Sequence, residues 1–356
     1  MDALRAAGAT WPGAVAVSGG GDSVALMFLL AAYAKQAKQP APVILTVDHG
    51  LRADSAKDAK AVAKIATDAG LKAHVLTFKG AAPKSDVEAE ARHARYQLMG
   101  EWLTANKVDA LYVAHTMEDQ AETFLLRLAR GSGLDGLSAM RVIAHYPLAG
   151  FDALRVVRPL LEFPRAALRD YLKSKKQSWL EDPMNADPRF ARSRLRASWP
   201  QLEALGLTAS RLADAAEHLG RAREALEGMT EALLARAAKF DTGGALLDAV
   251  RLKMAPREVG LRALAAVLSR ISGEAYRPRF GRLERLFDAI RDGTLAGGAT
   301  LHGCIVAPAP RALSAFGTGT LAVTREKPRS LPLEIAPKPH KSVAVPVKAA
   351  AKIHRN

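Results

Sequence analysis

The sequence predicts an α/β protein: a doubly wound, mostly parallel sheet followed by a smaller, helical α+β domain. Three observations predict this fold. Short apolar runs alternate with helical stretches from residue 14 to about residue 150, and polar clusters directly follow three of these runs. Past residue 205, helical patterns come first and two short strand-like runs come last. Alternating strand and helix segments are typical of parallel sheets that carry helices on both faces.

The predicted strands of the first domain are short apolar runs flanked by turn residues, as is usual for buried parallel strands. They cover 14–17, 43–47, 73–78 and 110–114, and the predicted helices cover 23–38, 54–69, 86–105 and 118–130. Ligands bind at the carboxyl ends of the strands in such sheets, so functional groups should directly follow the strands.

The second domain begins with a long amphipathic pattern that runs from about Thr208, a good N-cap residue, to about Lys239. Two further helices are predicted over 256–271 and 279–292, and two strands over 299–306 and 319–324. We therefore expect a catalytic domain over 1–200, a second domain over 205–325 and a flexible basic tail over 326–356. The tail holds five prolines and seven Lys/Arg residues against two acids.

Charge balance and cysteine content limit the class of function. The 356 residues include 51 Lys and Arg against 36 Asp and Glu, a formal net charge of +15, which predicts a polyanionic partner. Binding to a membrane surface would also fit this charge, but the longest apolar run, 24–33, is too short to span a bilayer and no signal-peptide core is present. With Cys304 alone, disulfides within the chain, cysteine zinc sites and iron–sulfur clusters are excluded. We expect a cytoplasmic nucleotide or nucleic-acid enzyme with no membrane partner.

The first polar cluster joins a strand to a helix through a turn of small residues. Its members are Ser18, Gly19, Gly20, Gly21, Asp22 and Ser23. Glycines let backbone N–H groups approach an anion, and the next helix directs its positive dipole end to the same place. The turn holds no lysine, so it is not a Walker loop. This cradle suits the pyrophosphate of ATP and resembles the PP-loop of the ATP-pyrophosphatase superfamily, although small residues could also serve packing alone.

Acidic residues define the second and third clusters. Asp48 follows the second strand and, together with Asp22, could hold the Mg²⁺ that a triphosphate requires; alternatively, it caps the next turn. Asp119 and Glu122 lie three residues apart near a predicted helix start, after His115, so their carboxylates share one face. Such a pair either complements the helix dipole or holds an ammonium group or a metal, which would be Mg²⁺ rather than zinc.

Arginines supply the candidate contacts to phosphate and RNA. Arg92 and Arg95 lie three residues apart on a helix and can face one phosphate together, or belong to a solvated face. Arg192 and Arg196 belong to an arginine-rich segment around Phe190, a composition that suits single-stranded RNA or a nucleotide but also a salt-bridged linker. The G-x-G-x-x-G pattern at 131–136 follows a helix instead of a strand, which argues against dinucleotide binding.

Taken in order, these segments resemble the tRNA(Ile)-lysidine synthetase family over about residues 14–200. The segments are 18–23, 47–52, 91–96, 114–123, 130–134, 158–161 and 181–185, with Arg192 and Arg196. The chain departs from the family pattern at Glu118, where an aspartate is usual, and at Ser193, where an asparagine is usual.

The resemblance implies a two-step reaction on tRNA(Ile) with a CAU anticodon. ATP would adenylate the C2 oxygen of the wobble cytidine with release of pyrophosphate, and the ε-amine of L-lysine would then displace AMP. In this scheme Asp22 and Asp48 contact metal or phosphate, and Asp119 and Glu122 hold lysine. His115, Arg192 and Arg196 would contact AMP or the cytosine.

Three alternatives compete with this interpretation. A tRNA thiolase would need more cysteines than this chain has. A small-molecule, amide-forming ligase would leave the charge of +15 unexplained and shows no glutaminase nucleophile. An RNA-binding protein with a vestigial nucleotide fold would not require the intact Ser18, Asp22 and Glu122.

Overall fold

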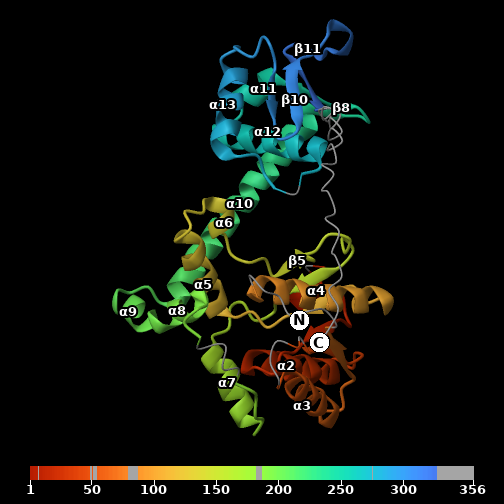
Figure 1. The fold of residues 1–356 in the computed structure, drawn as a ribbon, viewed down its shortest axis with the longest axis vertical. Coiled ribbons are helices and arrows are strands. Elements are labelled where there is room, and N and C mark those ends of the chain that lie inside the picture. The colour runs from red at the N-terminus through yellow and green to blue at the C-terminus, as the bar shows by residue number, and fades with distance from the viewer. Residues whose placement is uncertain are drawn as a thin grey trace, which may run out of the picture. The chain divides into compact units, whose positions relative to one another are not determined.

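The computed structural model describes residues 1–6, 8–48, 50, 54–78, 87–181, 187–274 and 276–326 (Figure 1). The chain divides into two compact units, Met1–Leu226 and Glu227–Asn356, and the division falls within helix α10 (Ala209–Ala237). The predicted domain limits, 200 and 205, lie ahead of this helix. His49, Arg52, most of segment 181–185 and the tail beyond Glu326 lie outside the described residues.

The first unit contains the predicted mostly parallel sheet. Its strands are β1 (Ala14–Ala16), β2 (Val43–Asp48), β3 (Ala73–Thr77), β4 (Ala110–Tyr112), β5 (Ile143–His145) and β6 (Arg155–Val157). They are ordered β3-β2-β1-β4-β6-β5, and only the edge strand β5 pairs antiparallel. The four predicted strands are confirmed. Strands β5 and β6 were not predicted, because His145 and Arg155 leave each of them without an uninterrupted apolar run like those of β1 and β4.

The four predicted helices of the first unit are confirmed, with ends close to the predicted positions: α2 (Gly21–Gln36), α3 (Ser55–Asp68), α4 (Val87–Ala105) and α5 (Met117–Leu128). The unit also contains helices for which no bounds were predicted: α1 (Asp2–Ala6), α6 (Leu134–Leu137), α7 (Arg165–Ser174), α8 (Ala191–Ala197) and α9 (Trp199–Ala204). Residue Thr208 caps α10 as expected, since its Oγ1 accepts from the N–H of Arg211 at 3.3 Å.

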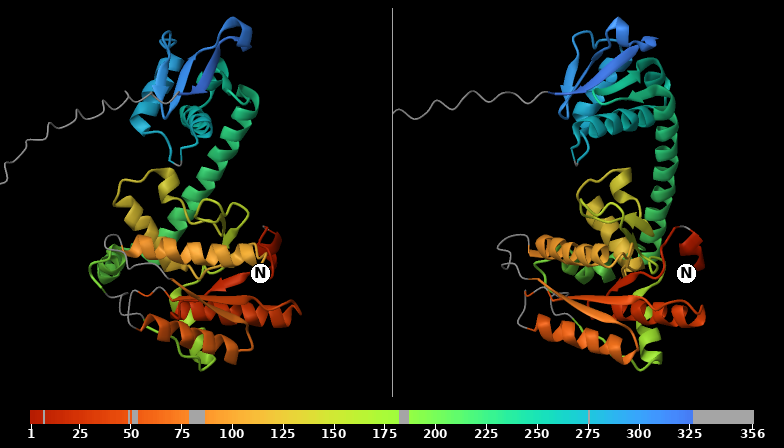
Figure 2. Two further views of the ribbon diagram at one scale, coloured as in Figure 1. Left: turned by 45° about the vertical axis from the view of Figure 1, so that its right-hand side comes forward. Right: turned by 90° about the vertical axis from the view of Figure 1, so that its right-hand side faces the viewer.

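Both faces of the sheet are covered, as a doubly wound fold requires. Successive residues of a strand point to opposite faces. Val15 therefore packs in a cluster with α2, α3 and α7, while its neighbour Ala14 packs in a second cluster with α4. Ile44 and Leu45 divide in the same way. Figure 2 shows α4 in orange on one face of the sheet and α2 and α3 on the other. Packing on two sides explains why the central strands β1 and β4 consist of apolar, buried residues.

The second unit is a five-stranded antiparallel sheet with helices. Its remaining elements are β7 (Ala238–Phe240), β8 (Gly244–Asp248), α11 (Ala249–Met254), α12 (Arg257–Ser272), α13 (Phe280–Arg291), β9 (Ala299–Leu301), β10 (Cys304–Pro308), the 3₁₀ helix η2 (Arg311–Leu313), β11 (Ala315–Thr318) and β12 (Thr320–Arg325). The strand order is β7-β8-β12-β10-β9. The predicted helical α+β character is confirmed, and in the part of the chain that the structure describes no helix is long and apolar enough to cross a bilayer.

The single strand predicted over 299–306 is wrong: this segment is a β-hairpin. Strands β9 and β10 pair antiparallel with Leu301 opposite Cys304. The two residues between them, His302 and Gly303, have φ angles of 55° and 68°. Positive φ at both positions is typical of the tight turns that join hairpin strands. The run reads as one strand because its apolar residues continue on both sides of the turn.

Candidate active site

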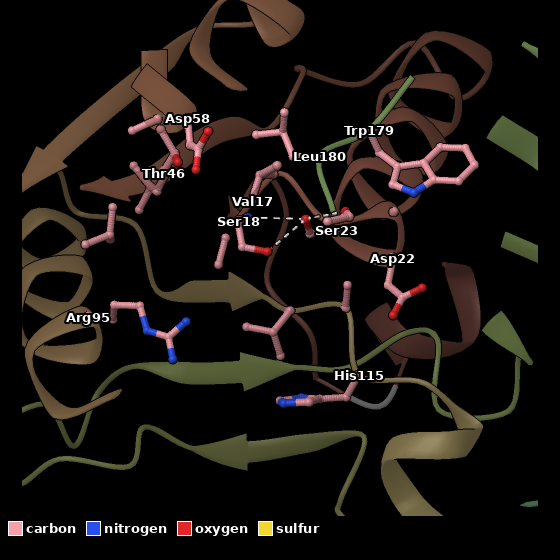
Figure 3. A pocket seen from close by; sticks show the side chains of 18 of the residues that line it. Val17, Ser18, Asp22, Ser23, Thr46, Asp58, Arg95, His115, Trp179 and Leu180 are labelled. Carbon is pink, nitrogen blue, oxygen red and sulfur yellow. Dashed lines mark hydrogen bonds between the residues drawn. The ribbon is translucent and has the colours of Figure 1, made fainter. Parts of the chain in front are cut away.

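A cavity of about 860 Å³ opens at the carboxyl ends of β1, β2 and β4 (Figure 3). Its lining includes much of the first polar cluster, both arginines predicted on α4, and His115 and Asp119 next to α5. Residues that the sequence did not single out also line it: Arg165, Arg169, Trp179 and Leu180. The first and third predicted clusters therefore converge, whereas Asp48 of the second cluster, Glu122 and Arg192 are not among the described residues that line this cavity.

The loop after β1 is closed by the hydroxyl of Ser23. This Oγ donates to the carbonyl of Gly20 at 2.8 Å and accepts from the backbone N–H of Ser18 at 3.2 Å. Its proton is therefore committed, so the Oγ of Ser18, 3.3 Å away, is the donor in the contact between the two hydroxyls. Figure 3 shows both contacts as dashed lines. The first N–H groups of α2 have no partner within the helix and are available to an anion at this loop.

Gly19 adopts a backbone conformation that side chains rarely take. Its φ is +94°, and a Cβ atom at this position would lie 2.8 Å from Cδ1 of Leu180. The carbonyl of Gly19 accepts from the N–H of Leu180 at 2.9 Å, and Trp179 packs beside Gly21. The segment at 179–180 thus forms a wall of the cavity that holds the loop in place.

Asp119 and Glu122 lie on one face of α5, as their spacing predicts, and both are nearly buried. The Oδ2 of Asp119 accepts from the backbone N–H and Oγ1 of Thr116, at 2.9 and 3.0 Å, which forms a capping box at the helix start. Burial by itself would raise the pKa of Asp119, but the positive charge of Arg165 and the Thr116 N–H bring it below its usual value. Both the dipole interpretation and the ligand interpretation of this acid are therefore compatible with its position.

Arg165, the first residue of α7, connects the phosphate loop to the acidic pair. Its guanidinium donates to Asp119 Oδ1 at 2.7 Å and to Glu122 Oε1 at 2.9 Å, and its Nε lies 3.3 Å from Asp22 Oδ2. Burial raises the pKa of the Asp22 carboxyl, and the charge of Arg165 offsets part of that increase. Arg196 donates to both carboxylate oxygens of Glu122, at 2.7 and 3.0 Å.

Glu118 has a structural contact in this arrangement. Both of its carboxylate oxygens accept from the backbone N–H of Arg165 at 3.0 Å. A carboxylate at a helix N-terminus satisfies a free N–H group and complements the dipole. The longer glutamate at the position where the family usually has aspartate thus anchors the helix that carries Arg165.

His115 is a neutral imidazole in this structure. Burial and the nearby positive charges of Arg158 and Arg92 lower its pKa to about 4, against the opposing charge of Asp119. The Nε of Arg158 donates to His115 Nδ1 at 3.2 Å, so the imidazole carries its proton on Nε2. His115 can therefore donate a hydrogen bond to a ligand from Nε2, but it is not poised to accept a proton there.

The predicted arginines take two kinds of position. Arg92 and Arg95 both line the cavity, and Figure 3 shows Arg95 beside it. Arg92 also stacks on the ring of Tyr96, with its guanidinium carbon 5.0 Å from the ring centroid. Arg192 donates to Thr123 Oγ1 at 3.4 Å from outside the lining.

Asp48 makes the turn contact that its alternative interpretation anticipated. Its Oδ1 accepts from Ser55 Oγ at 2.5 Å and from the N–H of Gly50 at 3.2 Å. Within the described ranges, no group of three or more His, Cys, Asp or Glu side chains is arranged to hold a metal. Magnesium needs only one or two protein carboxylates when phosphate oxygens and water complete its shell, so a magnesium ion held by Asp22 and Asp48 stays a prediction.

Arg165 and Arg169 are the main site residues that sequence reasoning missed. Arg165 follows the Pro164 that starts α7 and lies more than 40 positions from its acidic partners. Nothing in its local sequence distinguishes it from the other arginines of the chain. A search for basic residues at predicted helix starts, next to a proline, would have included it.

Comparison with known proteins agrees with this description. A family model described as a PP-loop domain matches residues 11–202, more than half of the chain. A tRNA(Ile)-lysidine synthase of Ruegeria pomeroyi is 39% identical over 292 residues, which cover 82% of this chain and 68% of that protein. One of Methylobacterium nodulans is 39% identical over 332 residues, or 92% of this chain and 94% of that protein. Among solved structures, a U34-tRNA thiolase of Methanococcus maripaludis has a TM-score of 0.48 and 18% identity, and the match covers 58% of this chain and 72% of that one.

Proposed function

The chain belongs to the tRNA(Ile)-lysidine synthase family, and we propose that it joins L-lysine to the wobble cytidine of tRNA(Ile) with a CAU anticodon. In the first step the C2 oxygen of the cytosine attacks the α-phosphorus of ATP and pyrophosphate leaves. In the second step the ε-amine of lysine attacks C2, the oxygen leaves with AMP, and the amine loses a proton. Holding the reactants together lowers the entropic barrier of both steps.

One observation carries this proposal: the phosphate cradle and Asp119 line the same cavity, and the guanidinium of Arg165 contacts Asp22 of the cradle and both members of the buried pair, Asp119 and Glu122. The Ser18–Ser23 loop suits a pyrophosphate group, and Asp119 with Glu122 offers the negative charge that an ammonium group requires. Arg165 contacts both sets. A simple nucleotide-binding protein has no need for the second set.

The remaining residues have roles that follow from their positions. Asp22 and Asp48 would share the Mg²⁺ that accompanies ATP. Arg92 and Arg95 line the cavity where phosphate or RNA would lie, and His115 can donate from Nε2 to an oxygen of AMP or cytosine. Arg196 and Arg192 would contribute positive charge toward the nucleotide. We place the reaction in the cytoplasm, where ATP, lysine and tRNA are available.

The cysteine gives no support to the thiolase alternative. Cys304 lies in the second unit, fully buried, and its Sγ lies 3.4 Å from the carbonyl oxygen of Leu268. Burial raises the pKa of this thiol, which disfavours the thiolate that sulfur transfer requires. This side chain is a core residue of the α12–β10 packing.

The proposal is tested by incubating the protein with ATP, Mg²⁺, labelled lysine and a tRNA(Ile) transcript that carries a CAU anticodon. We expect lysine in this tRNA and none in a methionine tRNA with the same anticodon. Pyrophosphate release without tRNA-linked lysine would instead favour another amine or a small-molecule substrate. If neither tRNA-linked lysine nor pyrophosphate forms, the proposal is contradicted.

Asp22→Ala tests the assignment of the phosphate loop. We expect pyrophosphate release to be lost while tRNA affinity stays within a few-fold, because Asp22 belongs to the loop that is proposed to hold the phosphates of ATP. The matched control is Asp170→Ala on α7, whose exposed carboxylate pairs with Lys173. Unchanged turnover in the Asp22 variant would remove the loop assignment.

A further inference from the structure

Arg165 occupies the place that the amine substrate needs. Under the proposed function, on which this inference rests, the ε-ammonium of lysine binds Asp119 and Glu122. In the structure the guanidinium of Arg165 already donates to one oxygen of each, at 2.7 and 2.9 Å. Its side chain is 19% exposed and that of Glu122 is 1% exposed, so water does not compete effectively for these contacts.

Every oxygen of the two carboxylates has a hydrogen-bond donor. Thr116 holds Asp119 Oδ2, Arg165 holds Asp119 Oδ1, and Arg196 binds both oxygens of Glu122. Glu122 Oε1 accepts twice, once from each arginine, which uses its lone pairs fully. Asp119 Oδ1 and Glu122 Oε2 each accept one of these hydrogen bonds, so an added ammonium group would have to share an oxygen with a guanidinium group that already binds it.

The charges lead to the same conclusion. Asp119, Glu122 and Asp22 carry three negative charges, which Arg165, Arg196 and the nearby Arg169 balance. A further cation beside Asp119 and Glu122, in a largely buried site, would be repelled by the guanidinium groups of Arg165 and Arg196. Lysine therefore competes with Arg165 for the carboxylates.

Arg165 also has an alternative anionic partner within reach. Its Nε lies 3.3 Å from Asp22 Oδ2, at the start of α2, where the phosphate loop ends. A triphosphate bound to that loop brings several negative charges to this edge of the guanidinium. Phosphate is a strong partner for arginine, through paired, charge-assisted hydrogen bonds.

We propose that Arg165 makes lysine binding depend on ATP: it neutralises Asp119 and Glu122 in the nucleotide-free enzyme and turns to the triphosphate when nucleotide binds, which frees the carboxylates for the ammonium group. Lysine then enters only when the activating substrate is present. Arg165 is a positioning residue in this scheme, because it acts through the acids that hold the substrate.

The test is equilibrium binding of L-lysine to the full-length protein, with and without an ATP analogue that carries an α,β-methylene bridge. We expect the analogue to strengthen lysine binding in the wild type by about ten-fold or more, within the usual range of coupling between sites. In Arg165→Met, lysine should bind the free protein more tightly than it binds the free wild type. The effect of the analogue should then fall to about two-fold or less, since no guanidinium remains to be moved.

Lys173→Met is the matched control, because it removes an exposed positive charge from the same helix and should keep the full coupling. If Arg165→Met does not fold, Arg165→Lys provides a second variant whose compact ammonium cannot bridge three carboxylates, and its coupling should be intermediate. A third measurement needs no variant. Saturating lysine must increase the affinity of the wild type for the ATP analogue by the same factor by which the analogue increases its affinity for lysine.

Two results would overturn the inference while leaving the proposed function intact. Both assume that lysine is still incorporated into tRNA(Ile). One is wild-type lysine affinity that does not change with the analogue. The other is an Arg165→Met protein that loses affinity equally in both conditions, as a purely structural role predicts. Failure of lysine incorporation itself would instead overturn the proposed function.

Discussion

Replacing Glu122 by glutamine should destabilise the first unit much more than the same replacement at an exposed position. Glutamine keeps the shape and one oxygen acceptor but loses the charge and turns the other oxygen into a donor. Glu122 accepts three hydrogen bonds from two guanidinium groups, at 2.7, 2.9 and 3.0 Å, and only 1% of its side chain is exposed. The variant would leave Arg165 and Arg196 facing an amide.

The magnitude follows from these three contacts. A charge-assisted hydrogen bond contributes about 1 kcal/mol more than a neutral one, so three of them give about 3 kcal/mol. Arg196 is 33% exposed, and water compensates part of its loss. We therefore expect the free energy of unfolding to fall by about 2–3 kcal/mol.

The control is Glu217→Gln on α10. This glutamate also pairs with an arginine, Arg221, at 2.5 Å, but its side chain is 65% exposed. An exposed pair of this kind contributes about 0.5 kcal/mol or less. Glu122→Gln and Glu217→Gln thus make the same substitution in a glutamate that pairs with arginine, and the two sites differ in how far the glutamate is buried.

Urea unfolding followed by tryptophan fluorescence is the appropriate assay, because all four tryptophans belong to the first unit. They are Trp11, Trp102, Trp179 and Trp199. The signal therefore reports on the unit that contains Glu122. A loss of stability in Glu122→Gln no larger than that in Glu217→Gln would refute the claim that this carboxylate is buried between two guanidinium groups.

Three further predictions concern the histidine, the loop and the tail. His115 has a pKa of about 4 in the folded protein, against about 6.5 in the unfolded chain. Between these pH values the unfolded chain binds a proton that the folded protein does not, so the free energy of unfolding decreases as the pH falls from 6.5 toward 4. The loss in free energy of unfolding is about 3 kcal/mol. In urea titrations at pH 7 and 4.5, His115→Gln should lose less stability between the two pH values than the wild type does. An equal loss in both proteins would contradict a neutral His115. Gly19→Ala should lower the free energy of unfolding by about 1–3 kcal/mol in the same assay, because the φ of Gly19 is +94°. Gly20→Ala should leave it unchanged, because an added Cβ would have only Ser18 Oγ nearby, at 3.7 Å. Deleting 326–356 should weaken tRNA binding most at low salt and reduce its salt dependence, because the tail would contact phosphates; an unchanged salt slope would exclude that contact.

Much of the fold follows from local patterns in the chain. The apolar runs at 14–17, 43–47 and 110–114 became the largely buried strands of the sheet, whereas the run at 73–78 became the partly exposed edge strand β3. The periodic segments between them became helices. Strands β5 and β6 could not be predicted, since each combines two apolar residues with a polar one, His145 or Arg155, and shows no apolar run. The turn at His302 and Gly303 was missed because its positive φ angles follow from hairpin pairing with β10.

The candidate site divides in the same way. The Ser18–Ser23 loop and the Asp119–Glu122 face were predictable, because their members are neighbours in the chain and strand and helix geometry alone places them together. The neutral state of His115 depends on its burial and on Arg158, which lies 43 positions away. No local pattern can provide that environment.

The sequence by itself determined the class of fold, the phosphate loop and the family, because each of these is written in adjacent residues whose geometry is set by the backbone. Only the tertiary structure decided that Arg165 joins Asp22 to the acids on α5. Its partners Asp119 and Glu122 lie 46 and 43 positions away, and packing of α7 beside α2 and α5 brings them within hydrogen-bond distance. The physical reason is that charge neutralisation in a buried site depends on distance in space, which the order of residues along the chain does not specify.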